Sequence, residues 1–236
     1  MKAFYDLHIH SALSPCAENE MTPNNIVNMA YIKGLDIIAV TDHNVALNCE
    51  AVLKCAKHRG ILAVPGMELE TREEVHLVCL FPGLEEVLKM QNIVNNALPD
   101  LENREDIFGQ QIIMDEDDNT IGNYKQMLLT AVDLSIDEVF EKVGSLGGIV
   151  VPAHIDRDSY SIISNLGIVP DYLDIKYLEF SKDCVANEFI SRNSYLSAYK
   201  FLKSSDAHNL GNLLEKESSF EVEEISIECL FEFLRK

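Results

Sequence analysis

Short apolar runs alternate with segments of helical character along most of this chain. Runs of this length, rich in β-branched and other apolar residues, are typical of buried strands. Strands that alternate with helices imply a mostly parallel sheet with right-handed crossovers. The expected strands are 3–9, 35–41, 61–64, 75–81, 149–152, 173–180 and 201–205. Seven such strands predict an α/β fold, a closed or nearly closed (β/α)7 barrel of the TIM-barrel type, with functional side chains at the strand ends.

Helix signals separate these runs. Thr22 and Pro23 predict a helix start, with Thr as the cap and Pro in the first turn. Further helices are expected over 47–59, over 84–96 and after the capping box Ser135–Glu138, and a last one begins at Ser226, after a short strand near 219–223. The alternation breaks at about 83–134, where a helix precedes two short strands around an acidic turn. We interpret 83–134 as an insertion in a single domain that covers residues 1–236.

Composition narrows the possible functions. The chain carries 39 acidic and 19 basic residues, a net charge of −20, which makes stable nucleic-acid binding and binding to an anionic membrane unfavourable. A phosphorylated substrate remains compatible, because bound divalent cations can reverse the local field. No apolar run approaches a membrane span, and the N-terminus lacks the pattern of a signal peptide, so we expect a cytoplasmic protein. The six cysteines form no CxxC pair, which indicates reduced thiols.

The histidines are the most informative residues. His8 and His10 are two positions apart at the end of a predicted strand, so their side chains share a face. His58 lies in a helix tail, where a cation suits the helix dipole, and we interpret it as structural or solvated. The other histidines fall at or near strand ends, a distribution that favours a metal cluster over scattered core histidines. The histidines assigned to the cluster are His8, His10, His43, His76, His154 and His208.

Carboxylates occur at the same strand ends. Glu68 follows Pro65-Gly66, a turn that is expected to project it into the mouth of the barrel, and Asp206 precedes His208 by two residues. Mixed imidazole and carboxylate ligands suit Zn, Mn or Fe. The candidates are too many for one tetrahedral ion, so we expect two or three divalent ions that share a bridging carboxylate.

Five motifs together resemble those of the PHP (polymerase and histidinol phosphatase) superfamily. They match in order and in strand placement, and the resemblance covers nearly the whole chain outside the insertion. It implies a distorted seven-stranded β/α barrel with a trinuclear metal centre. The motifs are Asp6-Leu-His-Ile-His-Ser11, Thr41-Asp-His-Asn44, Pro65-Gly-Met-Glu68, Pro152-Ala-His154 and Ser205-Asp-Ala-His208.

The same resemblance implies how the ligands are shared among three ions. The first ion takes His8, His10, Glu68 and Asp206; the second takes Glu68, His76 and His154; the third takes His43 and His208. The family usually adds an Asp or His to the third ion from the loop after the first motif. In this chain that loop is longer. Glu18 is the best match when the loop is aligned on Thr22-Pro23, and Cys16 and Glu20 are alternatives.

The function that this resemblance implies is metal-dependent hydrolysis of a phosphate ester of a small metabolite or nucleotide. The ions are expected to lower the pKa of a bridging water toward neutrality. Arg157 is a candidate clamp for a phosphate oxygen; alternatively it pairs with Asp156 or Asp158 at the surface. Asp42 is a candidate for orienting a histidine; alternatively it caps the following helix. Two other functions remain open: a metal-binding regulatory domain without turnover, and a metal-dependent C–N hydrolase.

Overall fold

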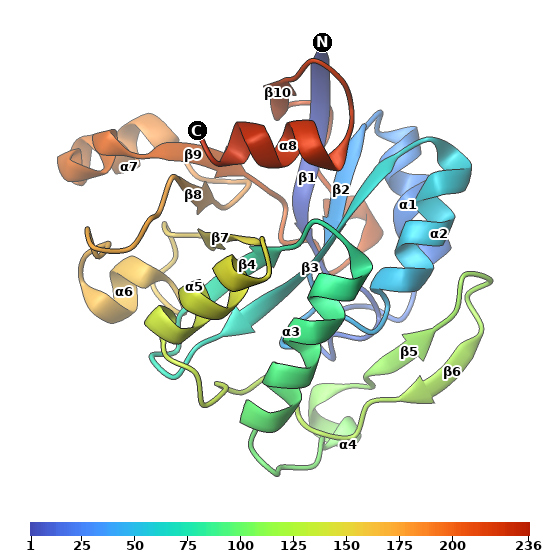
Figure 1. Ribbon diagram of the computed structural model, residues 1–236. Helices are drawn as coiled ribbons and strands as arrows, with labels where there is room; N and C mark the ends of the chain where they lie inside the picture. The colour runs from blue at the N-terminus through green and yellow to red at the C-terminus, as the bar shows by residue number, and fades with distance from the viewer.

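A computed structural model describes all residues, 1–236, as two curled sheets and a small hairpin with helices packed outside (Figure 1). The larger sheet has the strand order β10-β1-β2-β3-β4-β7. Its strands are β1 (Lys2–Ile9), β2 (Ile37–Val40), β3 (Leu62–Glu70), β4 (His76–Leu80), β7 (Ile149–Pro152) and β10 (Ser219–Glu221). The strands β8 (Tyr177–Phe180) and β9 (Lys200–Lys203) form a separate parallel pair.

The longer helices begin where their capping residues predict. The Thr22 side chain accepts a hydrogen bond from the Asn25 N–H at the start of α1, and Ser135 and Glu138 form the expected capping box of α5. In Figure 1, α1 and α2 cover one side of the sheet, and α8 lies beside the N-terminal end of β1. The longer helices are α1 (Pro23–Ile32), α2 (Cys49–Arg59), α3 (Leu84–Ala97), α5 (Ile136–Ser145) and α8 (Ile227–Leu234). Three α-helices and two 3₁₀ helices are shorter: α4 (Glu105–Phe108), α6 (Ile162–Leu166), α7 (Ala186–Arg192), η1 (Ser194–Ala198) and η2 (Leu210–Asn212).

The sheet is less parallel than the alternation predicts. β1, β2 and β3 are parallel, but β4 is antiparallel to both β3 and β7. The reason is the connection between β3 and β4, which is residues 71–75 and is too short for a helical crossover. The expected regular seven-unit barrel is therefore interrupted at this hairpin, and the fold is α/β with a curled sheet.

β3 is also longer than predicted, because it continues through Pro65 and Gly66 instead of turning there. The carbonyl of Pro65 accepts a hydrogen bond from the Phe81 N–H at 2.8 Å, so the residue stays in the ladder without an N–H of its own. A Cβ at Gly66 would lie 2.8 Å from Thr41 Cγ2, which explains the need for glycine there. Glu68 consequently projects from the middle of a strand.

Single contacts link the edges of the two sheets. Ile9 forms a parallel bridge with Ala207, and the His10 N–H donates to the Ala207 carbonyl at 2.9 Å, so the chain after β9 lies beside the end of β1. On the other side, the Ile155 N–H donates to the Glu179 carbonyl at 2.8 Å, which joins the chain after β7 to β8. These links curl the sheets around one interior.

A register shift in β1 decides which of its side chains face that interior. The pairing of β1 with β2 shifts between Asp6 and Ile9. Leu7 packs with Ala3 in an apolar cluster to which both curled sheets and α8 contribute, whereas Ile9 packs in the cluster under α1 and α2. Such a bulge redirects the side chains that follow it. The apolar interior thus gives way to a polar site at His8 and His10.

The insertion packs against the loop that follows β1. It contains α3, α4 and the hairpin of β5 (Ile112–Met114) and β6 (Thr120–Asn123). The Asp118 carboxylate in the hairpin turn accepts hydrogen bonds from the Thr22 hydroxyl at 2.7 Å and the Asn24 N–H at 3.0 Å. The Ile112 N–H donates to the Ala12 carbonyl at 2.9 Å.

Across the whole chain, every helix is too short or too polar to cross a bilayer.

Candidate metal centre

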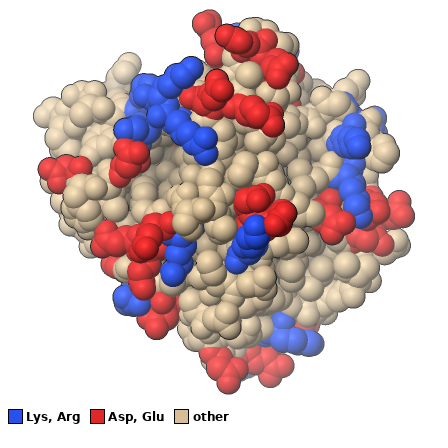
Figure 2. Space-filling view, viewed as in Figure 1, with Lys and Arg blue, Asp and Glu red and all other residues tan.

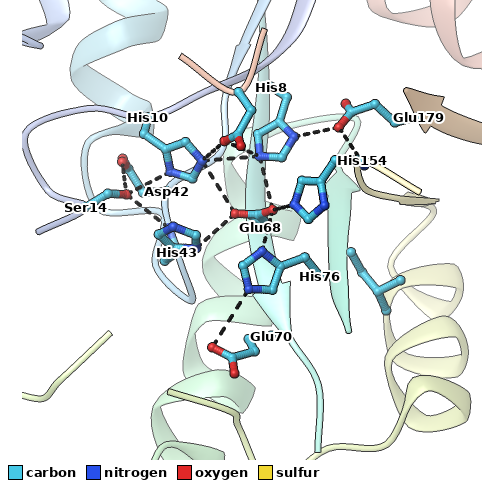
Figure 3. Close-up of polar contacts among 12 residues, drawn as sticks. His8, His10, Ser14, Asp42, His43, Glu68, Glu70, His76, His154 and Glu179 are labelled. Atoms are coloured by element: carbon cyan, nitrogen blue, oxygen red, sulfur yellow. Dashed lines mark hydrogen bonds and ion pairs between the residues drawn. The ribbon is translucent and has the colours of Figure 1, made fainter. Parts of the chain in front are cut away.

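Glu68 is the centre of a histidine cluster (Figure 3). Its side chain projects from β3, and the residue is fully buried. A parallel bridge between His43 and Glu68 holds the end of β2 against β3. Five imidazoles lie within 3.4 Å of its two oxygens. Oε1 lies 3.2 Å from His8 Nε2, 2.9 Å from His76 Nδ1 and 3.2 Å from His154 Nε2, and Oε2 lies 2.9 Å from His43 Nδ1 and 3.4 Å from His10 Nε2.

Asp206 closes the other side of the cluster. Its Oδ1 lies 2.9 Å from His10 Nε2 and 3.4 Å from His8 Nε2. The two Nε2 atoms are themselves only 3.2 Å apart. Three groups of donor atoms converge within 4.8 Å: His8, His10, Glu68 and Asp206; His43, Glu68 and His76; and His10, His43 and His208. The first group is the one that the resemblance implies for its first ion.

The hydrogen bond made by one ring nitrogen of an imidazole determines whether the other nitrogen turns a lone pair or an N–H toward the centre. The Ser14 hydroxyl donates to Asp42 at 2.7 Å, so its oxygen accepts from His10 Nδ1 at 3.0 Å. His10 Nε2 therefore turns a lone pair toward the Asp206 carboxylate. A lone pair facing a carboxylate at 2.9 Å is repulsive unless a cation lies between them. This arrangement fits a divalent metal.

A second histidine is held in the same way. His8 Nδ1 lies 2.8 Å from Glu179 Oε1, so the ring directs Nε2 at Glu68 and Asp206. The same Glu179 oxygen accepts from the His154 N–H at 3.3 Å. Carboxylates that orient metal-binding imidazoles are a recurrent feature of metal sites.

The electrostatics of the cluster show strong coupling. Burial acts to lower the pKa of His8, but the charges of Glu179, Glu68 and Asp206 raise it well above its ordinary value. Burial acts to raise the pKa of Glu68, but His76, His8 and His43 hold it well below its usual range. Protons on the imidazoles thus offset the carboxylate charge where a divalent cation would do so. Glu68 Oε2 also has no hydrogen bond of good geometry.

Unusual backbone conformations occur at the ends of the strands that carry the site. His154 has φ +31°, Asp206 has φ +51° and Asn44, next to His43, has φ +53°. Positive φ is costly for residues other than glycine and is concentrated at functional sites. The Asn44 side chain compensates by donating to the Leu128 and Thr130 carbonyls. The fold tolerates strain here in order to bring these side chains together.

The two predicted catalytic residues, Arg157 and Asp42, both lie next to residues of the cluster. Arg157 Nη1 lies 2.6 Å from Asp206 Oδ2, so Arg157 pairs with neither Asp156 nor Asp158; its side chain is 44% exposed. Asp42 is buried behind Ser14 and also accepts from the Ser11 N–H and hydroxyl. It does not cap α2, whose N-cap residue is Asn48. Asp42 is therefore linked to the cluster by hydrogen bonds through Ser14 to His10.

The loop after β1 carries Glu18, the residue predicted for the third ion. Glu18 is exposed, and it is not among the residues whose donor atoms converge. Its backbone N–H donates to the His208 carbonyl at 2.9 Å, which places the preceding residues over His208. Cys16 is also exposed, and it too is absent from the groups of converging donors. Burial acts to raise the pKa of its thiol, but hydrogen bonds with His208 and His43 lower it to about 7.

Sequence reasoning missed three residues of the site. Glu179 is the single acidic residue in the apolar run that forms β8, and only this position in the sequence could have indicated a functional role. Ser14 had none, because serines are common in loops. Tyr160 stacks on His76 with the ring centroids 4.8 Å apart, and it is half-exposed beside the centre. His58, in contrast, is exposed in α2 and remote from the cluster, as predicted.

The chain is similar in sequence or in fold to several known proteins. A 5'-3' exoribonuclease of Haemophilus influenzae is 33% identical over 79 residues, which are 32% of this chain and 28% of that protein. The lesion-specific endonuclease PfuEndoQ of Pyrococcus furiosus aligns with a TM-score of 0.70 and 22% identity over 100% of this chain and 56% of its own. An amidohydrolase of Chromobacterium violaceum aligns with a TM-score of 0.61 and 18% identity, over 98% of this chain and 96% of its own.

The chain spans between 18% and 56% of the length of the curated relatives it matches. The family model of the PHP domain matches residues 6–179, most of the 236 residues. The matched region contains five of the six clustered histidines and Glu68. PHP domains bind divalent metals, and the chain brings the donors for them together. By its sequence and its histidine cluster, this chain belongs to the PHP domain family.

Proposed function

We propose that this protein is a metal-dependent phosphoesterase that hydrolyses a phosphate ester of a small metabolite or nucleotide. The observation that carries the proposal is the position of Glu68, whose two oxygens contact five imidazoles in a buried cluster. A carboxylate with donors on both sides suits a bridge between ions in a multinuclear hydrolytic site. We expect two or three ions of Zn, Mn or Fe.

The ligand sets follow from the converging atoms. Glu68 belongs to two groups of converging donors. One group also contains His8, His10 and Asp206, and the other contains His43 and His76. His154 contacts Glu68 Oε1. Divalent ions bound here supply Lewis acidity toward a phosphoryl oxygen and lower the pKa of water. Asp42 and Glu179 keep His10 and His8 in the tautomers that ligation requires.

Arg157 is the residue we assign to the substrate. Its guanidinium has five N–H donors, and its Nη1 lies 2.6 Å from Asp206 Oδ2. The remaining donors are available to a phosphate oxygen at the half-exposed edge of the centre. Arg157 thus links the phosphate to Asp206 and adds positive charge where the transition state gains negative charge.

Charge favours a small substrate. Acidic residues outnumber basic ones by 39 to 19, and Figure 2 shows Lys and Arg in separate small groups on the face drawn, most of them beside Asp or Glu. A long polyanion would meet this surface unfavourably. The names of the H. influenzae exoribonuclease and the P. furiosus endonuclease nevertheless favour a second candidate, a phosphodiester in a nucleic acid. A cytoplasmic location is part of the proposal, in keeping with six free thiols.

The experiment combines metal analysis with a substrate panel. Protein loaded with Mn or Zn is assayed on p-nitrophenyl phosphate, nucleoside monophosphates, short oligonucleotides and amides. We expect turnover of the small phosphate esters, and its loss in His8→Ala and Asp206→Ala. His58→Ala is the matched control, because His58 is an exposed histidine outside the cluster.

Each other result points to a different function. Turnover that survives both substitutions would exclude the proposed centre. Preference for oligonucleotides would favour the nucleic-acid candidate, and cleavage of amides alone would favour a C–N hydrolase. Full metal loading without turnover on any substrate would favour a metal-binding regulatory domain.

A further inference from the structure

The loop between β7 and α6 starts in the metal centre and is fastened where it ends. Its first residue on the centre is His154, a histidine of the cluster that points toward Glu68 (Figure 3). The Ser161 hydroxyl donates to the Arg157 carbonyl at 2.8 Å, which closes the loop on itself. The same hydroxyl accepts from the Ser164 N–H at 3.1 Å and so caps α6. The loop therefore has a defined conformation.

The far side of this loop is tied to the hairpin of β3 and β4. The Asn165 side chain donates to the Glu73 carbonyl at 3.0 Å and to the Glu74 carbonyl at 2.9 Å. The His76 N–H, at the start of β4, donates to the Tyr160 carbonyl at 2.8 Å. These bonds place Tyr160 beside a histidine of the cluster.

Tyr160 combines a costly backbone with an open aromatic ring. Its φ is +55°, which is unusual for a bulky residue, and such conformations are concentrated at ligand sites. The ring stacks on His76 with the centroids 4.8 Å apart and the planes inclined by 30°. Tyr160 is nevertheless 45% exposed. The structure thus holds an aromatic ring against the centre and leaves much of it free to contact another molecule.

Arg157 lies three residues before Tyr160 on the same loop. Its Nη1 is 2.6 Å from Asp206 Oδ2. Asp206 and His76 belong to different groups of converging donors, and Glu68 is the residue that these two groups share. One short loop therefore places a guanidinium beside one group and an aromatic ring beside the other. A phosphate ester bound across the two groups meets a phosphate-binding cation and an aromatic surface.

We propose that Tyr160 determines the substrate class, because its open ring surface stacks on a planar aromatic group of the ester, such as a nucleobase. This inference rests on the proposed phosphoesterase function and narrows it to nucleoside monophosphates. Stacking tolerates every base, since each base has a π face. The site is therefore expected to distinguish aromatic from aliphatic phosphate esters, and to distinguish poorly between one base and another.

The test compares two esters that differ only in the base. Metal-loaded protein is assayed on adenosine 5'-monophosphate and on ribose 5-phosphate. Their phosphonate analogues, in which CH₂ replaces the ester oxygen, are titrated by calorimetry. The variants are Tyr160→Phe, which keeps the ring, and Tyr160→Leu, which covers His76 without an aromatic face. Tyr195→Leu is the matched control, because Tyr195 is 41% exposed in η1, which carries no residue of the cluster.

We expect the wild type to favour adenosine 5'-monophosphate in kcat/KM by about 5- to 150-fold, the range that base stacking on an aromatic side chain supplies. The preference should lie mainly in KM and should appear as the same ratio of Kd for the phosphonates. Tyr160→Phe and Tyr195→Leu should keep it. Tyr160→Leu should bring the ratio close to unity at unchanged metal content.

The results that overturn the inference are separable from those that overturn the function. Equal kcat/KM for both esters in the wild type, or a preference that survives Tyr160→Leu, would overturn the role of Tyr160 and leave the phosphoesterase intact. An equal loss on both esters together with lost metal would reduce Tyr160 to a support for His76. No turnover of any phosphate ester would overturn the proposed function, and the phosphonate pair would then decide on Tyr160 by itself.

Discussion

The inner and outer halves of the centre differ in what holds them. The inner half, His8, His10 and Glu68, is fully buried and projects from β1 and β3 or directly after β1. The outer half, Cys16, Arg157 and His208, lies on loops and is partly exposed. Strand geometry fixes the inner donors, whereas hydrogen bonds between loops fix the outer ones. The inner half should therefore decide whether metals bind at all, and the outer half should decide which metal and which substrate.

The largest expected effect comes from the shared carboxylate. Glu68→Gln removes the charge that five imidazoles surround, so the inner ligands lose their common partner. We expect kcat/KM to fall by about 10³-fold, the upper end of what one electrostatic contact contributes in an active site, together with a loss of bound metal. Steady-state kinetics and metal analysis of the purified protein check this.

Glu70→Gln is the control for that substitution. Glu70 lies two residues further along β3, with its carboxylate 3.9 Å from His76 Nε2. A fall of less than about 10-fold is expected, because this contact is longer than a hydrogen bond and meets one imidazole instead of five. Equal losses in both variants would contradict an inner half centred on Glu68.

The next effect tests whether the inner half depends on its own supports. Glu179→Gln weakens the hydrogen bond that orients His8, at 2.8 Å, without touching the predicted ligand atoms. We expect metal affinity to fall by about 10- to 100-fold, as for other residues that orient metal ligands. A competition titration with a chelator measures this. Unchanged affinity would mean that β1 alone positions His8.

The inner half was largely predictable from sequence, and its supports were not. His8 and His10 follow from a period of two at a strand end, and that rule needs no tertiary information. The shift in β1 that turns both inward after Leu7 has no local signal, and neither has the continuation of β3 through Pro65-Gly66, residues that usually mark turns. Pairing with β4 overrides that local preference.

The outer half shows the limit of aligning loops. Glu18 was favoured over Cys16 by its distance from Thr22-Pro23, a criterion that ignores how the loop folds. The turn closed by Ala17 and Ser14 leaves both Cys16 and Glu18 exposed, and neither belongs to the groups of converging donors. Glu179 was missed for a similar reason, since its importance appears only when β8 lies beside His8.

The metal-free protein should lose stability toward both high and low pH. Partners raise the pKa of His8, His43, His76 and His208 in the folded state, so the stability they contribute is present below about pH 6.5 and is lost as pH rises. The pKa values of Glu68 and Asp206 are lowered in the folded state. The stability that these two carboxylates contribute is therefore lost as the pH falls below about 4. Maximum stability without metal is expected between these limits.

Bound metal should prevent the loss of stability that the metal-free protein shows as the pH rises. Ligand imidazoles must lose protons to bind an ion, so metal affinity rises with pH. The difference in melting temperature between metal-loaded and chelator-treated protein should therefore widen between about pH 6 and 8. Thermal unfolding followed by circular dichroism measures it. A constant difference across that range would indicate that the imidazoles do not bind the metal.

The smallest effect concerns the insertion that supports the outer half. Asp118→Ala removes three hydrogen bonds at the start of α1, one from Thr22 and two from Asn24, and α1 follows the loop that carries Cys16. We expect the free energy of unfolding to fall by about 1 kcal/mol, as for the loss of a helix cap, measured by urea denaturation. Asp117→Ala, an exposed neighbour on the same turn, should change it by less than about 0.5 kcal/mol.

The Asp118→Ala variant also tests whether the loop between β1 and α1 can become more mobile while β1 and β3 stay fixed. Thr22 and Asn24 lie next to the end of the loop, so freeing them should speed amide hydrogen exchange in the loop while the ions at Glu68 remain bound. The insertion also reaches the inner half by another route, because the Asn44 side chain donates to the Leu128 and Thr130 carbonyls and the Asn44 N–H donates to the Glu68 carbonyl at 2.8 Å. Loss of the ions at Glu68 in this variant would mean that loop and strands form one unit, and that exposure alone distinguishes the two halves.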